Sequence, residues 1–171
     1  DTPVMITVGP IRARDEITGA ILTCHRLTGT VRMDAEQARG MYLKGYRAAA
    51  RFSDSEPGSR EMSKCVELGK LFALSSHPVL ICGEDGTEKE IFAECIHNNS
   101  AYKGGPFVNV NLGGMTEEMQ LERLFGNPAA EDETLKKGAL TISDQGTLLI
   151  SEAETLSLVA QYRLYRALRY K

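Results

Sequence analysis

The strongest constraint on the fold of this chain is an alternation between two hydrophobic periods from residue 62 onward. Apolar residues at helical spacing mark four segments, residues 62–73, 89–99, 116–125 and 158–170. Short apolar runs typical of buried strands mark three more, residues 78–82, 106–112 and 146–151. Strands that alternate with helices predict an α/β fold, in which a parallel sheet carries helices on both faces.

The beginning of the chain follows a different pattern. Apolar and polar residues alternate along residues 3–27, and Asp15, Glu16 and Gly19 supply turn chemistry near the middle. This pattern predicts a β-hairpin.

A helix is predicted between this hairpin and the second part of the chain. Asp34 is a candidate N-cap, and apolar residues at helical spacing follow it as far as residue 52, which indicates about four turns. The stripe of small and aromatic residues on this helix suits core packing and equally a dimer seam. The polar segment 53–61 contains Pro57 and Gly58 and marks a domain boundary.

The charge and composition of the chain limit its partners. A net charge of -3 and a pI near 5.7 leave no basic face to displace the counterions of a nucleic acid, so DNA contact is expected only through a region absent here. No apolar run reaches the roughly 18 residues of a membrane span, and the N-terminus lacks a signal-peptide pattern, so we expect a cytoplasmic protein without membrane contact. The cysteines and histidines show no metal-ligand spacing, so no metal site is predicted from them.

The segment "LICGEDGTEKEIF", residues 80–92, has the pattern of a phosphate-binding loop. In such a loop, successive backbone N–H groups surround phosphate at a helix N-terminus, and a lysine reaches the β and γ oxygens. Lys89 stands at the required offset from two loop glycines, although any tight strand-to-helix turn needs such glycines and Lys89 could equally be a solvated lysine. The candidate nucleotide-binding residues are Gly83, Glu84, Asp85, Gly86, Thr87, Glu88, Lys89 and Glu90.

The chain from about Phe52 to its end resembles the central AAA+ domain of bacterial sigma-54-dependent transcriptional activators. In that family the loop is Gly-Glu-Ser-Gly-Thr-Gly-Lys-Glu, so Glu90 is normal, whereas Asp85 and Glu88 are departures. The segments "LERLFG" and "GTLLISEAETLSLVAQYRLYRAL" resemble the family's next helix, its Walker B strand and the helix after it. Residues 3–33 resemble, more weakly, the closing strands of a PAS sensor domain.

The resemblance implies three parts: the end of a PAS-like domain at 1–33, a linker helix at 34–52, and the N-terminal part of an AAA+ domain at 53–171. The implied AAA+ sheet is incomplete. In the family, the strand that follows the last helix lies between the Walker A and Walker B strands. Either the chain is therefore a fragment of a longer regulator, or residues 79–82 and 147–151 pair in another way.

The departures from the family weaken the implied ATP site. Walker B strands end Asp-Glu, the Asp holding magnesium and the Glu polarising water, but here Ser151 and Glu152 stand there. Glu152 is the candidate catalytic residue, or simply an acid in the first turn of a helix. A carboxylate at Glu88 about 4 Å from a phosphate oxygen costs on the order of 4 kcal/mol at an effective dielectric near 20. That weakens binding roughly a thousandfold.

Two further family features are missing. The Gly-Ala-Phe-Thr-Gly-Ala loop that touches sigma-54 has no counterpart in residues 127–145, which weighs against direct remodelling of sigma-54. The family's apolar adenine-binding residues are replaced by the polar segment 54–58, so we expect that apolar lining to be absent.

We therefore predict part of a sigma-54-type regulator with a degenerate ATP site that serves scaffolding, oligomerisation or signal transmission. ATP is the expected cofactor, bound weakly, and magnesium lacks its usual Asp. Expected partners are further copies of the protein and RNA polymerase or its sigma factor. Two alternatives stay open: a competent ATPase in which Asp85 or Glu154 replaces the metal carboxylate, and a module whose chemistry is ligand sensing in the PAS part.

Overall fold

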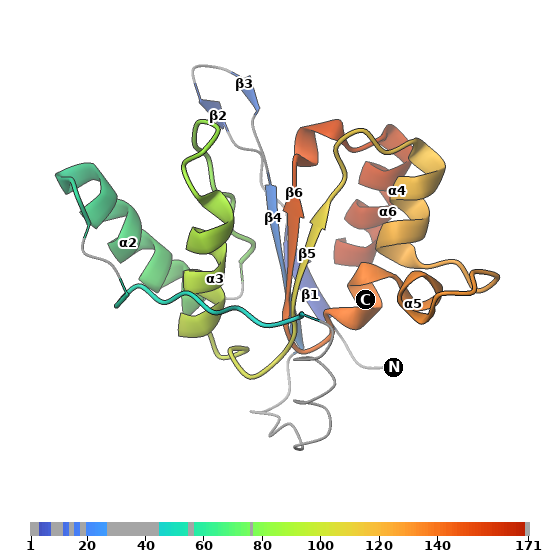
Figure 1. The fold of residues 1–171 in the computed structure, drawn as a ribbon, viewed down its shortest axis with the longest axis horizontal. Helices are drawn as coiled ribbons and strands as arrows, with labels where there is room; N and C mark the ends of the chain where they lie inside the picture. The colour runs from blue at the N-terminus through green and yellow to red at the C-terminus, as the bar shows by residue number, and fades with distance from the viewer. Residues whose placement is uncertain are drawn as a thin grey trace.

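A central sheet with helices on both faces forms the body of the protein (Figure 1). The computed structural model describes residues 4–7, 12–13, 16–17, 20–26, 45–54, 57–75 and 77–169, and before residue 45 only the backbone. One face carries α2 (Arg60–Ala73) and α3 (Lys89–Asn99). The other carries α4 (Glu117–Phe125), α5 (Glu133–Ile142) and α6 (Leu158–Arg169). The predicted α/β class is thus confirmed, and within the described residues no helix has the length and apolarity to cross a bilayer.

The sheet is mixed rather than purely parallel. Its strand order is β1-β4-β6-β5, formed by β1 (Val4–Thr7), β4 (Ala20–Arg26), β6 (Thr147–Ser151) and β5 (Phe107–Asn111). The β5–β6 pair is parallel, as predicted, whereas β4 pairs antiparallel with both β6 and β1. The antiparallel half arises because the N-terminal hairpin supplies the backbone partners for the second edge of β6.

The predicted β-hairpin forms in the backbone, with one correction. Strands β1 and β4 are its outer arms, and β2 (Arg12–Ala13) with β3 (Glu16–Ile17) extends it as a second antiparallel pair. The sequence placed Glu16 in the turn, but it lies in β3 opposite Ala13, because pairing continues further toward the tip than the apolar alternation does. Asp15 and Gly19 lie outside the described residues.

The strand predicted at 78–82 does not form. These residues have no regular secondary structure, since β4 occupies the edge of β6 that faces away from β5. The apolar run is nevertheless buried in part: Val79 is 7% exposed and packs with Ala93, Ile96 and Leu149. The apolar pattern therefore predicted burial correctly. The segment does not form a strand because the edge of β6 is already paired with β4.

The predicted helix at 34–52 is wrong in its second half. Gly45 has a φ of 73°, and residues 46–50 have no helical structure. Residues 34–44 lie outside the described part of the chain.

Side chains of α3 explain why this segment is extended. Glu94 accepts hydrogen bonds from the backbone N–H groups of Ala49 and Ala50, at 2.7 and 3.0 Å. Asn98 donates its side-chain amide to the carbonyls of Ala48 and Ala50, at 3.1 and 2.7 Å. Side chains of α3 therefore satisfy the backbone N–H and C=O groups that a helix would pair internally. For this reason the segment does not form a helix, although its apolar residues have helical spacing.

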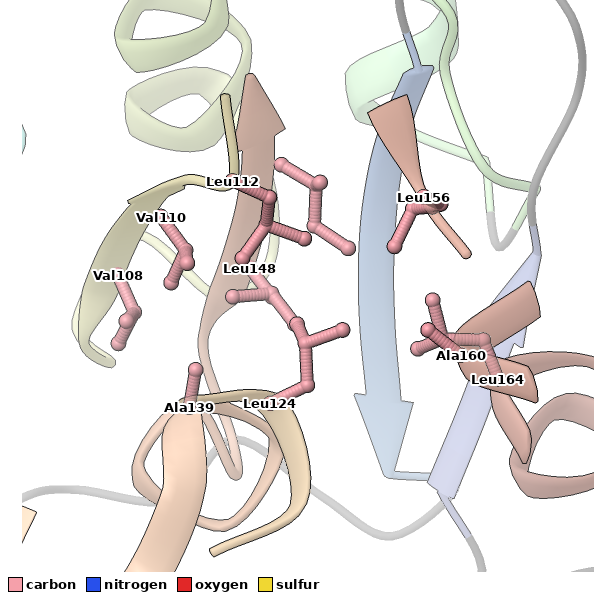
Figure 2. Packing of buried hydrophobic residues seen from close by; sticks show 10 residues of the cluster. Val108, Val110, Leu112, Leu124, Ala139, Leu148, Leu156, Ala160 and Leu164 are labelled. Carbon is pink, nitrogen blue, oxygen red and sulfur yellow. The ribbon is translucent and has the colours of Figure 1, made fainter. Parts of the chain in front are cut away.

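Two apolar clusters cover the two faces of the sheet. Side chains along β6 alternate: Leu148 and Ile150 point to the α4–α6 face, and Leu149 to the α2–α3 face. Figure 2 shows the larger cluster, which consists of Val108, Val110, Leu112, Leu124, Ala139, Leu148, Ile150, Leu156, Ala160 and Leu164. Because both faces of β6 are buried, its sequence is a continuous apolar run.

Sequence reasoning missed one helix, α5. Its N-cap is Asp132, whose side chain accepts hydrogen bonds from the N–H groups of Thr134 and Leu135. An acid followed by Glu133 is a helix-start signal. A glycine within the segment, Gly138, weakens the helical signal in the sequence. In the structure it has a φ of 72° and interrupts the helical backbone.

His97, near the end of α3, makes a buried polar contact with the sheet. It is 2% exposed, its Nδ1 lies 2.8 Å from Thr147 Oγ1, and its ring meets Phe107 edge to face. Burial lowers the pKa of His97 to about 4.

This pKa predicts a loss of stability in acid. The unfolded chain binds the His97 proton at a pKa near 6.5, so stability present above that pH is lost as pH falls toward 4, by about 3 kcal/mol in all. We expect His97→Gln to reduce this loss, measured as the free energy of unfolding by urea at pH 7 and 4.5. The exposed His77→Gln is the control. Equal pH dependence in wild type and His97→Gln would contradict the assignment.

Candidate functional site

The loop before α3 and the carboxyl ends of β5 and β6 meet at one end of the sheet (Figure 1). Between them lies a cavity of about 460 Å³. Of the residues singled out from sequence, it brings together Asp85, Gly86, Thr87, Glu88, Lys89, Glu90, Ser151, Glu152 and Glu154. Gly83 and Glu84 lie outside its walls, although both belong to the loop. Two motifs about sixty residues apart therefore form one site.

The loop keeps a glycine-type backbone at a position that carries glutamate. Glu88 is the N-cap of α3 and adopts left-handed angles, φ 55° and ψ 38°, and its side chain makes no capping hydrogen bond. Left-handed geometry costs an L-residue about 1–2 kcal/mol, and glycine avoids that cost. The exposed carboxylate of Glu88 lines the cavity. The loop thus places a carboxylate at a position whose backbone conformation favours glycine.

The loop lysine is bound within the loop itself. Lys89 Nζ donates hydrogen bonds to the carbonyls of Gly83 and Glu84, at 2.8 and 2.9 Å. The exposed Asp85 carboxylate lies 3.7 Å from the same ammonium. Thr87 Oγ1 adds a hydrogen bond to the Glu84 carbonyl at 2.7 Å. Two of the three N–H donors of the Lys89 ammonium are therefore used within the loop, and a phosphate that engages Lys89 competes with the Asp85 carboxylate.

Ser151 faces a carboxylate from α3. Its hydroxyl lies 2.9 Å from Glu90 Oε1, to which it donates, and 3.3 Å from Asn109 Oδ1. An aspartate at position 151 would instead set two carboxylates against each other without a cation between them. Ser151 and Glu90 are therefore compatible with each other as a hydroxyl donor and a carboxylate acceptor.

Glu152 is held by the end of the neighbouring strand. Its Oε1 accepts a hydrogen bond from Asn111 Nδ2 at 2.9 Å, and Asn111 Oδ1 accepts one from the Gly113 N–H at 2.7 Å. A Cβ at Gly113 would overlap the Glu152 carboxylate, so this side chain would have to shift to admit any larger residue there. Glu152 makes no side-chain capping bond to η1 (Ala153–Thr155). Sequence reasoning missed Asn111 and Gly113. The position of Asn111, a polar residue at the end of a predicted strand, was the signal that could have identified it.

The cavity is strongly acidic. One described cation, Lys89, lines it, against five carboxylates: Asp85, Glu88, Glu90, Glu152 and Glu154. Within the described residues, no three His, Cys, Asp or Glu side chains are placed to hold a metal ion. The site therefore presents a negative field where a phosphate would enter.

An apolar groove of about 320 Å³ adjoins the other side of the loop. Its walls include Met62, Cys65 and Phe72 of α2 and Val79 and Ile81 before the loop. The sequence predicted no apolar lining from residues 54–58, and the described members of that segment do not line this groove. Apolar surface beside the loop comes instead from α2 and from residues 79–81.

Known proteins that resemble this chain are transcriptional regulators. The Sigma-54 interaction domain family matches residues 57–171. Regulatory protein AtoC of Escherichia coli (strain K12) is 39% identical over 111 residues, which cover 63% of this chain and 24% of AtoC. Transcriptional activator RocR of Bacillus subtilis (strain 168) is 34% identical over 170 residues, 94% of this chain and 34% of RocR. The Nif-specific regulatory protein of Rhodobacter capsulatus is 37% identical over 114 residues, 65% of this chain and 20% of that protein. The chain thus spans about a fifth to a third of these relatives.

The backbone of Glu88 makes a stability prediction. Glu88→Gly removes the cost of left-handed geometry, about 1–2 kcal/mol, but glycine loses roughly 0.5–1 kcal/mol more backbone entropy on folding. The free energy of unfolding of the variant therefore rises by about 1 kcal/mol. For a chain of this size, that gain raises Tm by about 2–4 °C. Calorimetric melting of both proteins measures it. The matched control is Glu84→Gly, a loop position with ordinary φ, which we expect to lower Tm. A lower Tm in both variants would contradict the argument.

Proposed function

Because the chain belongs to the Sigma-54 interaction domain family of transcriptional regulators, we propose that it is part of such a regulator with a degenerate ATP site. In this proposal the domain binds nucleotide weakly, does not hydrolyse it efficiently, and serves the cytoplasmic regulator as a scaffold that self-associates and passes on a signal. The observation that carries the proposal is the cavity with five carboxylates and one lysine that is already bound to loop carbonyls.

Electrostatics supports weak binding. A triphosphate brings several negative charges into a cavity whose lining is already anionic, and Glu88 lies on the loop that must surround the phosphate. One carboxylate about 4 Å from a phosphate oxygen costs on the order of 4 kcal/mol at an effective dielectric near 20. Lys89 offsets part of this cost, but its ammonium is shared with the carbonyls of Gly83 and Glu84 and with the Asp85 carboxylate.

Weak hydrolysis follows from the residues beside the nucleotide. A bound magnesium ion would neutralise charge on the transferred phosphoryl group. Ser151 offers it a neutral hydroxyl instead of a carboxylate, and that hydroxyl is engaged by Glu90. Glu152, held by Asn111, could still orient a water molecule. The competent-ATPase alternative gains nothing from Asp85, whose fully exposed side chain contacts Lys89.

The hairpin supports a role in signal transmission. We assign residues 1–33 to the end of a PAS-like sensor, and β4 of that segment pairs with β6 through Ala20–Ile150, Ile21–Leu149 and Leu22–Leu148. Strand β6 ends at Ser151, in the wall of the cavity. A displacement of the hairpin would therefore act directly on the strand that carries the site. Contact with sigma factor or RNA polymerase, and DNA binding through other regions, belong to the proposal for the longer regulator.

Nucleotide titration tests the proposal. We expect isothermal titration calorimetry to show weak ATP binding by the wild type, with or without magnesium, and binding up to a thousandfold tighter by Glu88→Gly. Glu84→Gly is the control for loss of a loop charge, and it should bind as the wild type does. Turnover should require both Glu88→Gly and Ser151→Asp, measured as phosphate release. Robust magnesium-dependent turnover by the wild type would refute the degenerate site.

Two apolar faces support self-association. Leu68 and Leu71 of α2 are exposed, as is Leu74, which caps its C-terminus, and on α6 Leu158 and Tyr162 are exposed. The two helices lie on opposite sides of the sheet (Figure 1). Two different faces on opposite sides favour a head-to-tail contact over a self-complementary one.

This arrangement predicts that polar substitutions on α6 separate the copies. We expect the Leu158→Ser/Tyr162→Ser double variant to sediment as a monomer at concentrations where the wild type sediments as an oligomer, because two large apolar side chains leave the contact. Arg166→Ser, exposed on the same helix, is the control. Sedimentation of the wild type as a monomer at every concentration would count against self-association.

A further inference from the structure

A second cavity, of about 470 Å³, lies at the C-terminal end of α3, away from the phosphate-binding loop. Four basic residues from three segments line it: Arg47 and Arg51 from the extended segment, Lys70 from α2, and Lys103 after α3. Figure 1 shows the extended segment passing this end of α3 on its way to α2. The chain as a whole is acidic, with a net charge of -3, so this concentration of cations departs from its average surface.

Neutral polar groups complete the lining. Ser53, Asn98 and Asn99 contribute a hydroxyl and two amides. Asn98 already uses its amide donor toward the carbonyls of Ala48 and Ala50, which fixes the wall formed by the extended segment. The cavity volume falls in the range of small-molecule sites. Its lining is thus polar, cationic and built in part on fixed backbone.

Three of the four cations are not ion-paired with carboxylates of the described chain. Arg51, Lys70 and Lys103 form no ion pair with a described acidic residue. The nearby acids are engaged elsewhere: Asp54 accepts the Arg51 backbone N–H at 2.8 Å, and Glu94 accepts the N–H groups of residues 49 and 50. Lys70 also lies 6.0 Å from the centre of the Phe52 ring, which orients it beside the segment.

We propose that this cavity binds a small multivalent oxyanion, a phosphorylated or polycarboxylated molecule, which bridges the extended segment, α2 and α3. Guanidinium and ammonium groups that converge on one space are the usual ligands of such anions, and Arg can bind two oxygens at once. The C-terminus of α3 carries a partial charge of about -0.5, which the full positive charges of Arg51, Lys70 and Lys103 exceed. The site is independent of the proposed function.

A bound anion would strengthen the attachment of the extended segment to α3. That attachment now rests on Glu94 and Asn98, which bind backbone only. The anion adds Arg47 and Arg51 of the segment to Lys70 and Lys103 of the folded domain through a common ligand. The segment connects the N-terminal hairpin to α2, so its attachment is a point at which a small molecule can act on the regulator.

Titrations with inorganic phosphate, pyrophosphate and citrate test the site. Calorimetry at constant ionic strength, with chloride as the balancing anion, should give saturable binding by the whole chain. We expect the Lys70→Gln/Lys103→Gln variant to bind at least tenfold more weakly, equivalent to about 1.4 kcal/mol. Tighter binding of pyrophosphate than citrate assigns a phosphorylated ligand, and the reverse order a carboxylated one; either order supports the site.

Two control variants separate this site from other anion binding. Lys64→Gln/Lys137→Gln removes the same charge from exposed positions elsewhere and should leave binding unchanged. Lys89→Gln removes the loop lysine and should also leave it unchanged, which distinguishes this cavity from the proposed nucleotide site. Equal weakening in both double variants, or loss of binding in Lys89→Gln alone, would overturn the proposal.

Discussion

The structure depends on β6, which is buried on both faces and hydrogen-bonded on both edges. Leu148 and Ile150 hold the α4–α6 layer, Leu149 holds the α2–α3 layer, and the strand pairs with β5 and β4. Such a strand cannot shift by one residue without turning its apolar side chains to the wrong layer. Ser151 and the residue after it are therefore fixed relative to the loop before α3.

The two walls of the cavity share an unusual backbone conformation. Both walls of the cavity contain a non-glycine residue in left-handed conformation, Glu88 before α3 and Glu152 after β6, each with a φ of 55°. The surrounding contacts hold these conformations despite their cost. Ser151 and Glu90 satisfy each other across the cavity. In the function that we propose, this frame serves a structural role, with nucleotide as a ligand rather than a substrate.

The N-terminal region contacts the domain by two different means. Strand β4 adds to the sheet through backbone hydrogen bonds, and the extended segment is held to α3 by Glu94 and Asn98. Both contacts are made to backbone, so they depend on position more than on side-chain identity. They link the N-terminal region to β6 and α3, both of which contribute residues to the acidic cavity. The basic cavity lies on the second of these routes.

The sequence by itself determined the α/β class, because the alternating hydrophobic periods of residues 62–170 admit few other layer arrangements, and it located the loop and Glu152 through local motifs. Only the tertiary structure decided what pairs with what. Residues 78–82 formed no strand because β4 took the edge of β6, and the predicted helix at 34–52 failed in its second half because α3 satisfied its backbone. Asn111, the partner of Glu152, likewise came from a separate strand. Hydrophobic period is a local property, whereas the partners of backbone and polar groups are chosen across the whole fold.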